Sequence, residues 1–273
     1  SSVFSALSVA DLLKICGCDN DKRLRKFLDM QLKLYSQAPA DSTAALYGAT
    51  VLHIAQAPLG LWHLQESMQK LSDCLLSCFM RDRGHLHLNH RVTRLTASSH
   101  KKPWIVEVVD LKGELKEFHA SDVVFSLPPQ CLLELMSINS GLSTSFSKRL
   151  QNLTKPSGAL VFYGVVDRIA IPNGSSSHIQ IASDNLGSIF ISISLEGDGR
   201  APKGQATLIA SIFAEVDDWD SLNEKDYQSK KTTTLSLIVQ ELNRYFLFGS
   251  EVWRHQELAT PRSFVRWTGR PKG

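Results

Sequence analysis

The sequence predicts an α+β protein in which several helices precede an antiparallel sheet. Apolar residues recur every three or four positions in residues 9–13 and 24–35, which is the period of a helix with one buried face. After residue 158 the pattern changes to alternating and β-branched runs, separated by the Gly, Asn, Asp and Pro clusters typical of turns. A last helical stripe over residues 235–246 is long enough to cover one face of such a sheet.

Composition excludes several classes of protein. The chain has 273 residues, 43% of them apolar, which is enough for one large or two ordinary domains. Its net charge of +3 is scattered, so we expect no nucleic-acid partner. Five sparse cysteines indicate reduced thiols, and the longest apolar run, residues 159–163, is far shorter than the roughly 20 residues of a spanning helix. We therefore expect a cytoplasmic protein whose membrane contact, if any, is peripheral.

The early part of the chain is expected to be helical. Two helices are predicted over residues 9–13 and 24–35, and a third over residues 45–54, capped by Asp41 or Ser42.

A fourth, amphipathic helix is the element around which the rest of the chain is organised. Its apolar stripe consists of Leu61, Leu64, Met68, Leu71, Leu75 and Phe79. Pro58 and Gly60 loosen the backbone before it, so we expect the helix to begin near Trp62 and to end at Gly84.

Strands are predicted after this helix. Residues 85–90 alternate as a half-buried strand does, and a turn leads from them into residues 92–95. Residues 104–110 and 114–120 pair as a hairpin, and the apolar run 122–127 reads as a strand buried on both faces and stopped by two prolines.

The second half of the chain is predicted to form the antiparallel sheet. Short helices are expected through residues 131–136 and 146–153. Four strands follow, at residues 159–166, 178–182, 188–194 and 205–215. The long helix that carries the stripe 235–246 ends near Gly249.

The order of helix, glycine, strand and then Val92-x-x-Leu95 resembles the middle of the FAD-dependent carotenoid desaturases and isomerases of the phytoene desaturase (amine oxidase-like) superfamily. Four sequence segments most resemble the cyanobacterial C-3′,4′ desaturases: AALYGATVL, AQAPLGLWHL, SMQKLSD and TPRSFVRWTGRP. Two departures stand out. Glu66 occupies a position where the family usually has glycine, and the Gly-x-Gly-x-x-Gly dinucleotide fingerprint is missing, which leads us to expect a central fragment of such a protein.

The resemblance implies FAD as cofactor and assigns the parts of the chain. Residues 1–45 are expected to be a helical part of the substrate domain and residues 46–130 the middle of the FAD-binding domain. Residues 131–257 would form the substrate domain, with its antiparallel sheet and long helix, and residues 258–273 would return towards the FAD domain.

The resemblance also implies site residues. Arg91 and Val92 would lie against the FAD adenine, and Leu127 and Pro128 would approach the flavin. The turn that carries Gly60, Trp62 and His63 would face the substrate cavity. A second interpretation of the last two is a capping histidine and a tryptophan wedged in a domain interface.

The implied activity is desaturation of a carotenoid, a polyene, with hydride transfer to flavin. The first alternative is a carotenoid cis-trans isomerase of the same fold, which makes no net redox change. The second is a non-catalytic lipid-escort protein, similar to the GDP dissociation inhibitors, that uses no flavin. The resemblance does not identify catalytic residues, the electron acceptor or an oligomer.

Other patterns favour ordinary structural roles. The stretch 197–202 begins like a phosphate-binding fingerprint, but Pro202 occupies the place of the third glycine, so we predict a turn. His85, His87 and His90 have no carboxylate or thiol within their run, which favours a solvated strand face over a metal site. Cys74 and Cys78, one helical turn apart near the apolar stripe, are expected to pack as small hydrophobic residues.

The cluster of basic residues at positions 22–26 has two possible interpretations. Lys22, Arg23, Arg25 and Lys26 surround the apolar Leu24, Phe27 and Leu28. They could dock a helix on an anionic membrane surface, or they could be the solvated face of an ordinary helix.

Overall fold

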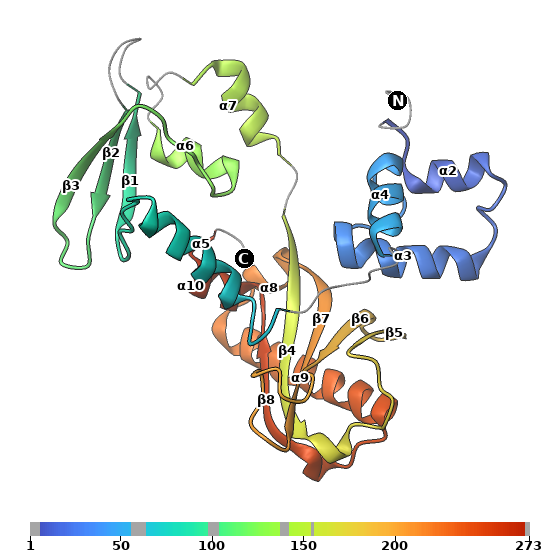
Figure 1. The fold of residues 1–273 in the computed structure, drawn as a ribbon. Helices are drawn as coiled ribbons and strands as arrows, with labels where there is room; N and C mark the ends of the chain where they lie inside the picture. The colour runs from blue at the N-terminus through green and yellow to red at the C-terminus, as the bar shows by residue number, and fades with distance from the viewer. Residues whose placement is uncertain (1–5, 56–63, 98–103, 137–141, 154–155, 271–273) are drawn as a thin grey trace. The chain divides into compact units, whose positions relative to one another are not determined.

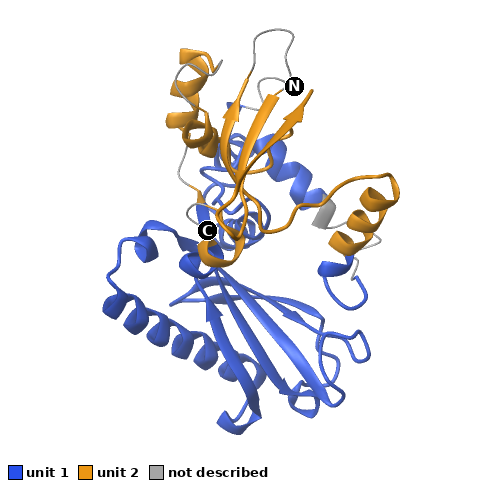
Figure 2. Cartoon of the chain, turned by 90° about the vertical axis from the view of Figure 1, so that its left-hand side faces the viewer, with its two compact units in different colours: residues 1–70, 157–264, 272 blue, residues 71–156, 265–271, 273 orange. Residues whose placement is uncertain are grey.

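The computed structural model describes residues 6–55, 64–97, 104–136, 142–153 and 156–270. It divides by its contacts into two compact units (Figure 2): unit 1 consists mainly of residues 1–70 and 157–264, and unit 2 of residues 71–156 and 265–271. Helices and antiparallel sheets occur together, so the predicted α+β class is confirmed. The functional boundaries at residues 45, 130 and 257 stay a prediction, since compactness does not test which segment binds which ligand.

Three helices open unit 1: α2 (Val9–Ile15), α3 (Lys22–Ser36) and α4 (Ala45–Ala55). A capping box begins α2, because the Ser8 hydroxyl accepts from the Asp11 N–H and the Asp11 carboxylate accepts from the Ser8 N–H, each at 3.0 Å. The fully buried Leu32 anchors their common core. All three helices were predicted.

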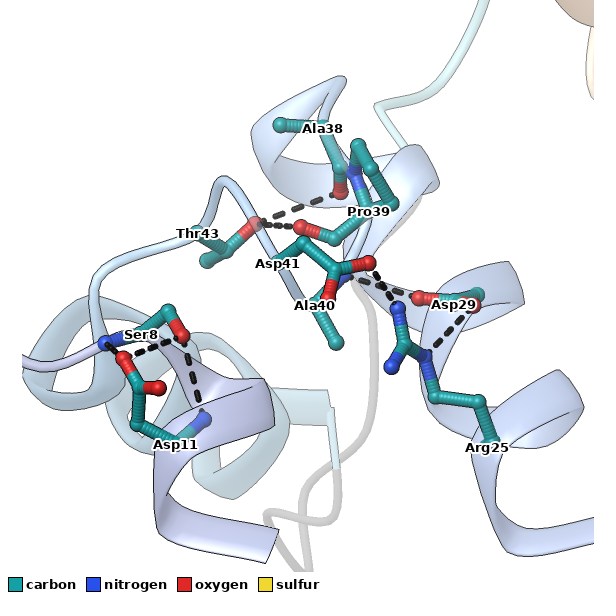
Figure 3. A network of polar contacts seen from close by, with 9 residues as sticks. All are labelled: Ser8, Asp11, Arg25, Asp29, Ala38, Pro39, Ala40, Asp41 and Thr43. Atoms are coloured by element: carbon teal, nitrogen blue, oxygen red, sulfur yellow. Dashed lines mark hydrogen bonds and ion pairs between the residues drawn. The ribbon is translucent and has the colours of Figure 1, made fainter. Parts of the chain in front are cut away.

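The expected cap of α4 is wrong. The Asp41 carboxylate instead accepts from the guanidinium of Arg25, which also donates to Asp29 at 2.9 Å (Figure 3). The helix begins at Ala45, and Thr43, whose hydroxyl donates to the carbonyls of Ala38 and Pro39, closes the turn before it.

Unit 1 also contains the large sheet. Its strands are β4 (Ser157–Asp167), β5 (His178–Ser183), β6 (Gly187–Ile193), β7 (Gln205–Glu215) and β8 (Trp253–Ala259). All neighbours are antiparallel, in the order β5-β6-β7-β4-β8 (Figure 1). The first four strands were predicted. The alternation rule gave no indication of β8, because residues 254–257 are all polar.

The long helix α9 (Glu224–Phe246) covers one face of this sheet, as predicted (Figure 1). Its fully buried Ile238 and Leu242 belong to the same core as Phe162, Ile191 and Leu208 of the strands. The helix ends at Leu247, which adopts a left-handed backbone with φ 59°, two residues before the expected Gly249. Short helices α8 (Asp217–Asp220), η2 (Arg168–Ala170) and η3 (Ser250–Val252) connect the larger elements.

Gly164 of β4 has a specific packing role on the covered face. A Cβ atom there would lie 2.5 Å from the Trp253 ring and 2.6 Å from the Phe162 ring. These two rings meet edge to face at 5.3 Å, and the Trp253 indole N–H donates to Asn243 of α9 at 2.8 Å. Glycine therefore lets the tryptophan join the sheet to the helix above it.

Unit 2 is built on a second sheet, with strands β1 (Arg91–Thr96), β2 (Trp104–Val109) and β3 (Leu115–Ala120) in that order. The predicted hairpin is confirmed. At its turn the Asp110 carboxylate accepts from the N–H groups of Lys112 and Glu114 and lies 2.8 Å from Lys116 Nζ. The pKa of Asp110 is lowered to about 2, mainly because the Lys116 ammonium stabilises the carboxylate and also because these N–H groups donate to it.

Helices complete the described part of unit 2. They are α5 (Gln69–Arg81), η1 (Pro129–Cys131), α6 (Leu132–Leu135), α7 (Thr144–Gln151) and α10 (Pro261–Thr268), of which α5 and α10 begin within unit 1. α10 was missed, although proline at its first position is a favourable helix start. No helix in the described ranges is long and apolar enough to cross a bilayer.

The predicted start of the organising helix is wrong. α5 begins at Gln69, because Glu66 takes a left-handed backbone with φ 73° and the Ser67 hydroxyl then accepts from the Gln69 N–H at 3.3 Å. The expected end at Gly84 is close, since the helix finishes at Arg81. The described part of its apolar stripe, from Leu64 to Phe79, is exposed, and Cys74 and Cys78 are exposed with it.

Two predicted strands do not form. Residues 85–90 end in a turn in which Asn89 has φ 58°, so the strand starts only at Arg91. Residues 122–127 are irregular, and Val124 is 94% exposed. A strand buried on both faces needs neighbours on both edges, and none of the described strands pairs with this segment.

The packing of α9 gives a first prediction. Leu242→Ala should lower the free energy of unfolding of the 273-residue chain by about 2–5 kcal/mol, because it opens a cavity in the core of unit 1. Leu75→Ala is the matched control: Leu75 is 64% exposed on α5, so its loss should cost under about 1 kcal/mol. Urea unfolding measures both changes. Equal losses would mean that α9 does not cover this sheet.

Candidate functional site

The segment around Val92 lies at a sheet edge. β1 is an outer strand, so alternate residues direct their backbone N–H and C=O groups away from β2. Val92 pairs with Val108 and Arg94 with Glu107, which leaves Thr93 as the extra residue of a β-bulge. Arg91 is exposed and Val92 half-buried. The strand therefore offers backbone hydrogen-bonding groups, re-aimed by the bulge, to a ligand beside it.

The segment that carries Leu127 and Pro128 turns into η1. Leu127 is 43% exposed, and the Pro128 carbonyl accepts from the Cys131 N–H at 2.9 Å. Burial raises the pKa of the Cys131 thiol, so this cysteine is poorly suited to act as a nucleophile. Among the residues that the structure describes, Gln130 Oε1 is buried and accepts no hydrogen bond. That oxygen is an acceptor available to a ligand hydroxyl or amino group.

These two segments meet at one apolar cavity within unit 2. The cavity has a volume of about 300 Å³, and its walls include Leu95, Trp104, Val123, Phe125 and Leu132. None of Arg91, Val92, Leu127 or Pro128 lines it. Leu95, on the same strand as Val92, and Phe125, just before Leu127, do line it, so the structure brings the two expected cofactor segments into one neighbourhood.

This neighbourhood fits the flat aromatic part of a dinucleotide better than its phosphates. The strand edge and the apolar cavity suit a flat ring, whereas Gln130, with its unpaired Oε1, does not line the cavity. The stretch 197–202, which superficially resembles a phosphate-binding fingerprint, is a hairpin turn, as predicted. Its Asp198 carboxylate accepts from the N–H groups of Leu195 and Arg200.

The other candidate residues are those of the turn before α5 and the histidines of residues 85–90. Gly60, Trp62 and His63 lie outside the described residues. Of the histidines, His87 contacts the His90 ring at 5.4 Å and the Phe118 ring at 4.8 Å. The described part of the chain contains no group of three or more His, Cys, Asp or Glu side chains placed to hold a metal ion.

A further surface, which the sequence did not reveal, is the face of the large sheet opposite α9, here called the open face. Helix α3 covers part of it, since Gln31 donates to Gln180 and Lys33 lies over the Phe213 ring. Strand pairing aligns His178, Ser192, Ile209, Tyr163 and Glu257 in one row across the five strands. The neighbouring row contains Gln180, Phe190, Ser211, Val161 and Ala259.

The open face is mixed: half of the residues in its two rows are apolar or aromatic, and the other half are polar, namely His178, Gln180, Ser192, Ser211 and Glu257. His178 stacks on Phe190 with ring centroids 5.7 Å apart, and Tyr163 is 38% exposed. Burial, with a smaller effect of Glu257, raises the pKa of Tyr163, so its hydroxyl stays protonated at neutral pH. At strand spacings of about 4.8 Å, each row spans roughly 20 Å.

Glu66 marks the place where the sequence departs from the family pattern. Its φ of 73° belongs to the left-handed region that glycine adopts without cost. Its N–H donates to the Asp198 carbonyl at 2.7 Å, which ties the entry to α5 to the 197–202 turn within unit 1. The backbone geometry thus explains why the resemblance places glycine here.

Comparison with known proteins identifies relatives. A family model described as "Flavin containing amine oxidoreductase" matches residues 12–269. The chain is 31% identical over 126 residues to a chloroplastic prolycopene isomerase of Arabidopsis thaliana; the match covers 43% of this chain and 21% of that protein. The chain therefore spans about a fifth of the length of this curated relative.

Two solved structures share the fold. An oxidoreductase of Methanosarcina mazei superposes with a TM-score of 0.66 at 13% identity, covering 93% of this chain and 55% of that one. A protein of Pyrococcus furiosus superposes with a TM-score of 0.64, also at 13% identity, covering 93% and 57% respectively.

Glu66 provides the second prediction. Both Glu66→Gly and Glu66→Ala remove the exposed side chain that lies 3.4 Å from Lys70, so they differ only in backbone freedom. A left-handed φ raises the free energy of the folded state for alanine but not for glycine. The glycine variant should therefore be the more stable of the two by about 1 kcal/mol. Thermal unfolding tests this order. A more stable alanine variant would contradict the left-handed conformation of residue 66.

Proposed function

Because the chain belongs to the flavin-containing amine oxidoreductase family, we propose that it is part of an FAD-dependent oxidoreductase that desaturates a carotenoid. One observation carries the substrate class. The open face presents the apolar and aromatic side chains of Val161, Tyr163, Phe190 and Ile209 next to one another in its two rows, with polar residues, Glu257 among them, around these four. Such a surface suits an extended polyene, which offers no charge to bind. The resemblance of the chain to a prolycopene isomerase supports the same class.

The two units would contribute differently. In unit 2 the backbone N–H and C=O of Val92 would bind the adenine, Arg91 would lie beside it, and Leu127 and Pro128 would border the flavin ring. In unit 1 the open face would orient the polyene and exclude water from it. Gly60, Trp62 and His63 are retained as proposed substrate-cavity residues.

A bound flavin would supply the hydride acceptor for this reaction, and the neighbouring carbon of the substrate would lose a proton. The protein's part is positioning, because the polyene itself has no acidic or basic group to engage. The proton's destination would be solvent or a residue outside those assigned here.

The alternative function is carotenoid cis-trans isomerisation, which the name of the Arabidopsis relative favours. The two activities are separated by incubating the flavin-loaded full-length protein with a carotenoid and measuring the mass of the product. Desaturation removes two hydrogen atoms for each new double bond, whereas isomerisation leaves the mass unchanged and alters only the absorption spectrum. A full-length protein that carries lipid but no flavin would instead indicate an escort role and contradict both.

Val92 gives the third prediction. Val92→Pro removes the backbone N–H and should weaken FAD binding to the full-length protein roughly ten- to a hundred-fold, whereas Val92→Ala should change it little. Flavin fluorescence titration measures the affinities, and circular dichroism first checks that both variants fold. If folded variants bind flavin equally well, Val92 is an ordinary strand residue and the adenine lies elsewhere.

A further inference from the structure

A second cavity, remote in sequence from the flavin segments, lies within unit 1. It has a volume of about 420 Å³ and opens between α3 and the β5–β6 hairpin. Its helical wall includes Lys22, Arg25, Lys26 and Lys33, and its hairpin wall includes Ser183 and Ser188. The flavin segments lie in unit 2, whereas the hairpin wall of this cavity continues the open face, because Ser188 lies on the same side of the sheet as Phe190.

Hydrogen bonds join the two walls. The Gln180 side chain donates to the Met30 carbonyl of α3 at 2.7 Å and to the Ser188 hydroxyl at 2.9 Å, and it accepts from Gln31 at 2.6 Å. One glutamine therefore ties the helix to both strands of the hairpin. The cavity is consequently a built feature of the unit and not a gap between independent surface side chains.

The charges of the helical wall are unbalanced. Arg25 is neutralised, since its guanidinium donates to the carboxylates of Asp29 and Asp41 (Figure 3), contacts that raise its pKa. Lys22, Lys26 and Lys33 remain, spaced so that they share the helix face at the cavity. Asp19 is the other carboxylate in the lining, so ammonium groups outnumber the carboxylates left to balance them.

The hairpin wall supplies hydroxyl donors. The Ser183 oxygen already accepts from the N–H groups of Asn185 and Leu186, and the Ser188 oxygen accepts from Gln180. With their oxygens occupied in this way, both hydroxyl protons remain available for a ligand acceptor. Lysines opposite hydroxyl donors are suited to a compact anion with several oxygen atoms.

From this geometry we infer that the α3–hairpin cavity binds the phosphate group of a phosphorylated ligand. Lys22 and Lys26 contribute the charge at the mouth, Lys33 and the two serines bind deeper, and Arg25 holds the helix end in place. The phosphate comes either from a small soluble molecule or from a lipid head group. In the second case the basic cluster is a head-group site and not a general membrane patch.

The test uses the 273-residue chain and two probes. Inorganic pyrophosphate is titrated by calorimetry, and vesicles of phosphatidylcholine with phosphatidic acid are tested by flotation against vesicles with phosphatidylserine. The Lys22→Gln/Lys26→Gln variant should bind at least one phosphate probe on the order of tenfold more weakly. The matched control, Lys148→Gln/Lys225→Gln, removes the same charge from exposed helix positions that do not line the cavity and should bind as the wild type does. Lys22→Arg/Lys26→Arg should retain binding.

Binding of pyrophosphate identifies a soluble ligand, and binding only of phosphatidic acid vesicles identifies a lipid head group. The inference is overturned if the wild type binds neither probe, or if the control variant loses as much affinity as the cavity variant. It is also overturned if pyrophosphate does not bind and phosphatidylserine vesicles bind as well as those with phosphatidic acid. None of these readouts depends on flavin, so the result stands apart from the proposed function.

Discussion

One constraint governs unit 1: a single helix can bury only one face of a five-stranded sheet. β4 pairs with both β7 and β8, and every second residue along it, such as Phe162, lies under α9. Because side chains in a strand alternate between faces, the register that puts Phe162 in the core also puts Tyr163 on the open face. One strand register therefore determines both which side chains are buried under α9 and which lie on the open face. The side chains of the open face are thus presented without any cost to the core.

The sequence predicted those elements whose periodicity is strong and whose partners lie in the same chain. α3, α9, the β2–β3 hairpin and the strands from β4 to β7 all belong to this group. Prediction failed where a local backbone preference overrode the pattern. Glu66 and Asn89 adopt left-handed conformations, which delay the start of α5 and abolish the strand at residues 85–90. Polar β8 forms because β4 has a free edge for it, a fact of topology that no local pattern contains.

The apolar run 122–127 failed for a different reason. Its composition suits a doubly buried strand, yet within this chain Val124 is exposed and no described strand lies beside it. The stripe of α5 is likewise apolar and exposed. Both features show that apolarity predicts burial only when a covering partner exists, and unit 2 supplies none to these segments among its described residues.

The candidate sites could be predicted only in part. Resemblance placed Val92 and Leu127 near a cofactor, and the structure brings Leu95 and Phe125 from the same segments to one cavity. The open face and the α3–hairpin cavity could not be predicted from the sequence. The open face depends on the order of the strands, and the cavity depends on the contacts of Gln180. The basic cluster was visible in the sequence, but the pairing of Arg25 with Asp29 and Asp41 was not.

The central claim of this account is that the open face of the sheet holds a polyene. A photoreactive polyene, irradiated in complex with the flavin-loaded full-length protein, tests it directly when the labelled peptides are identified by mass spectrometry. If the open face binds the polyene, labels should fall on its residues, such as Tyr163, Phe190 and Ile209. Labels confined to α9, or absent from β4, β6 and β7, would contradict it.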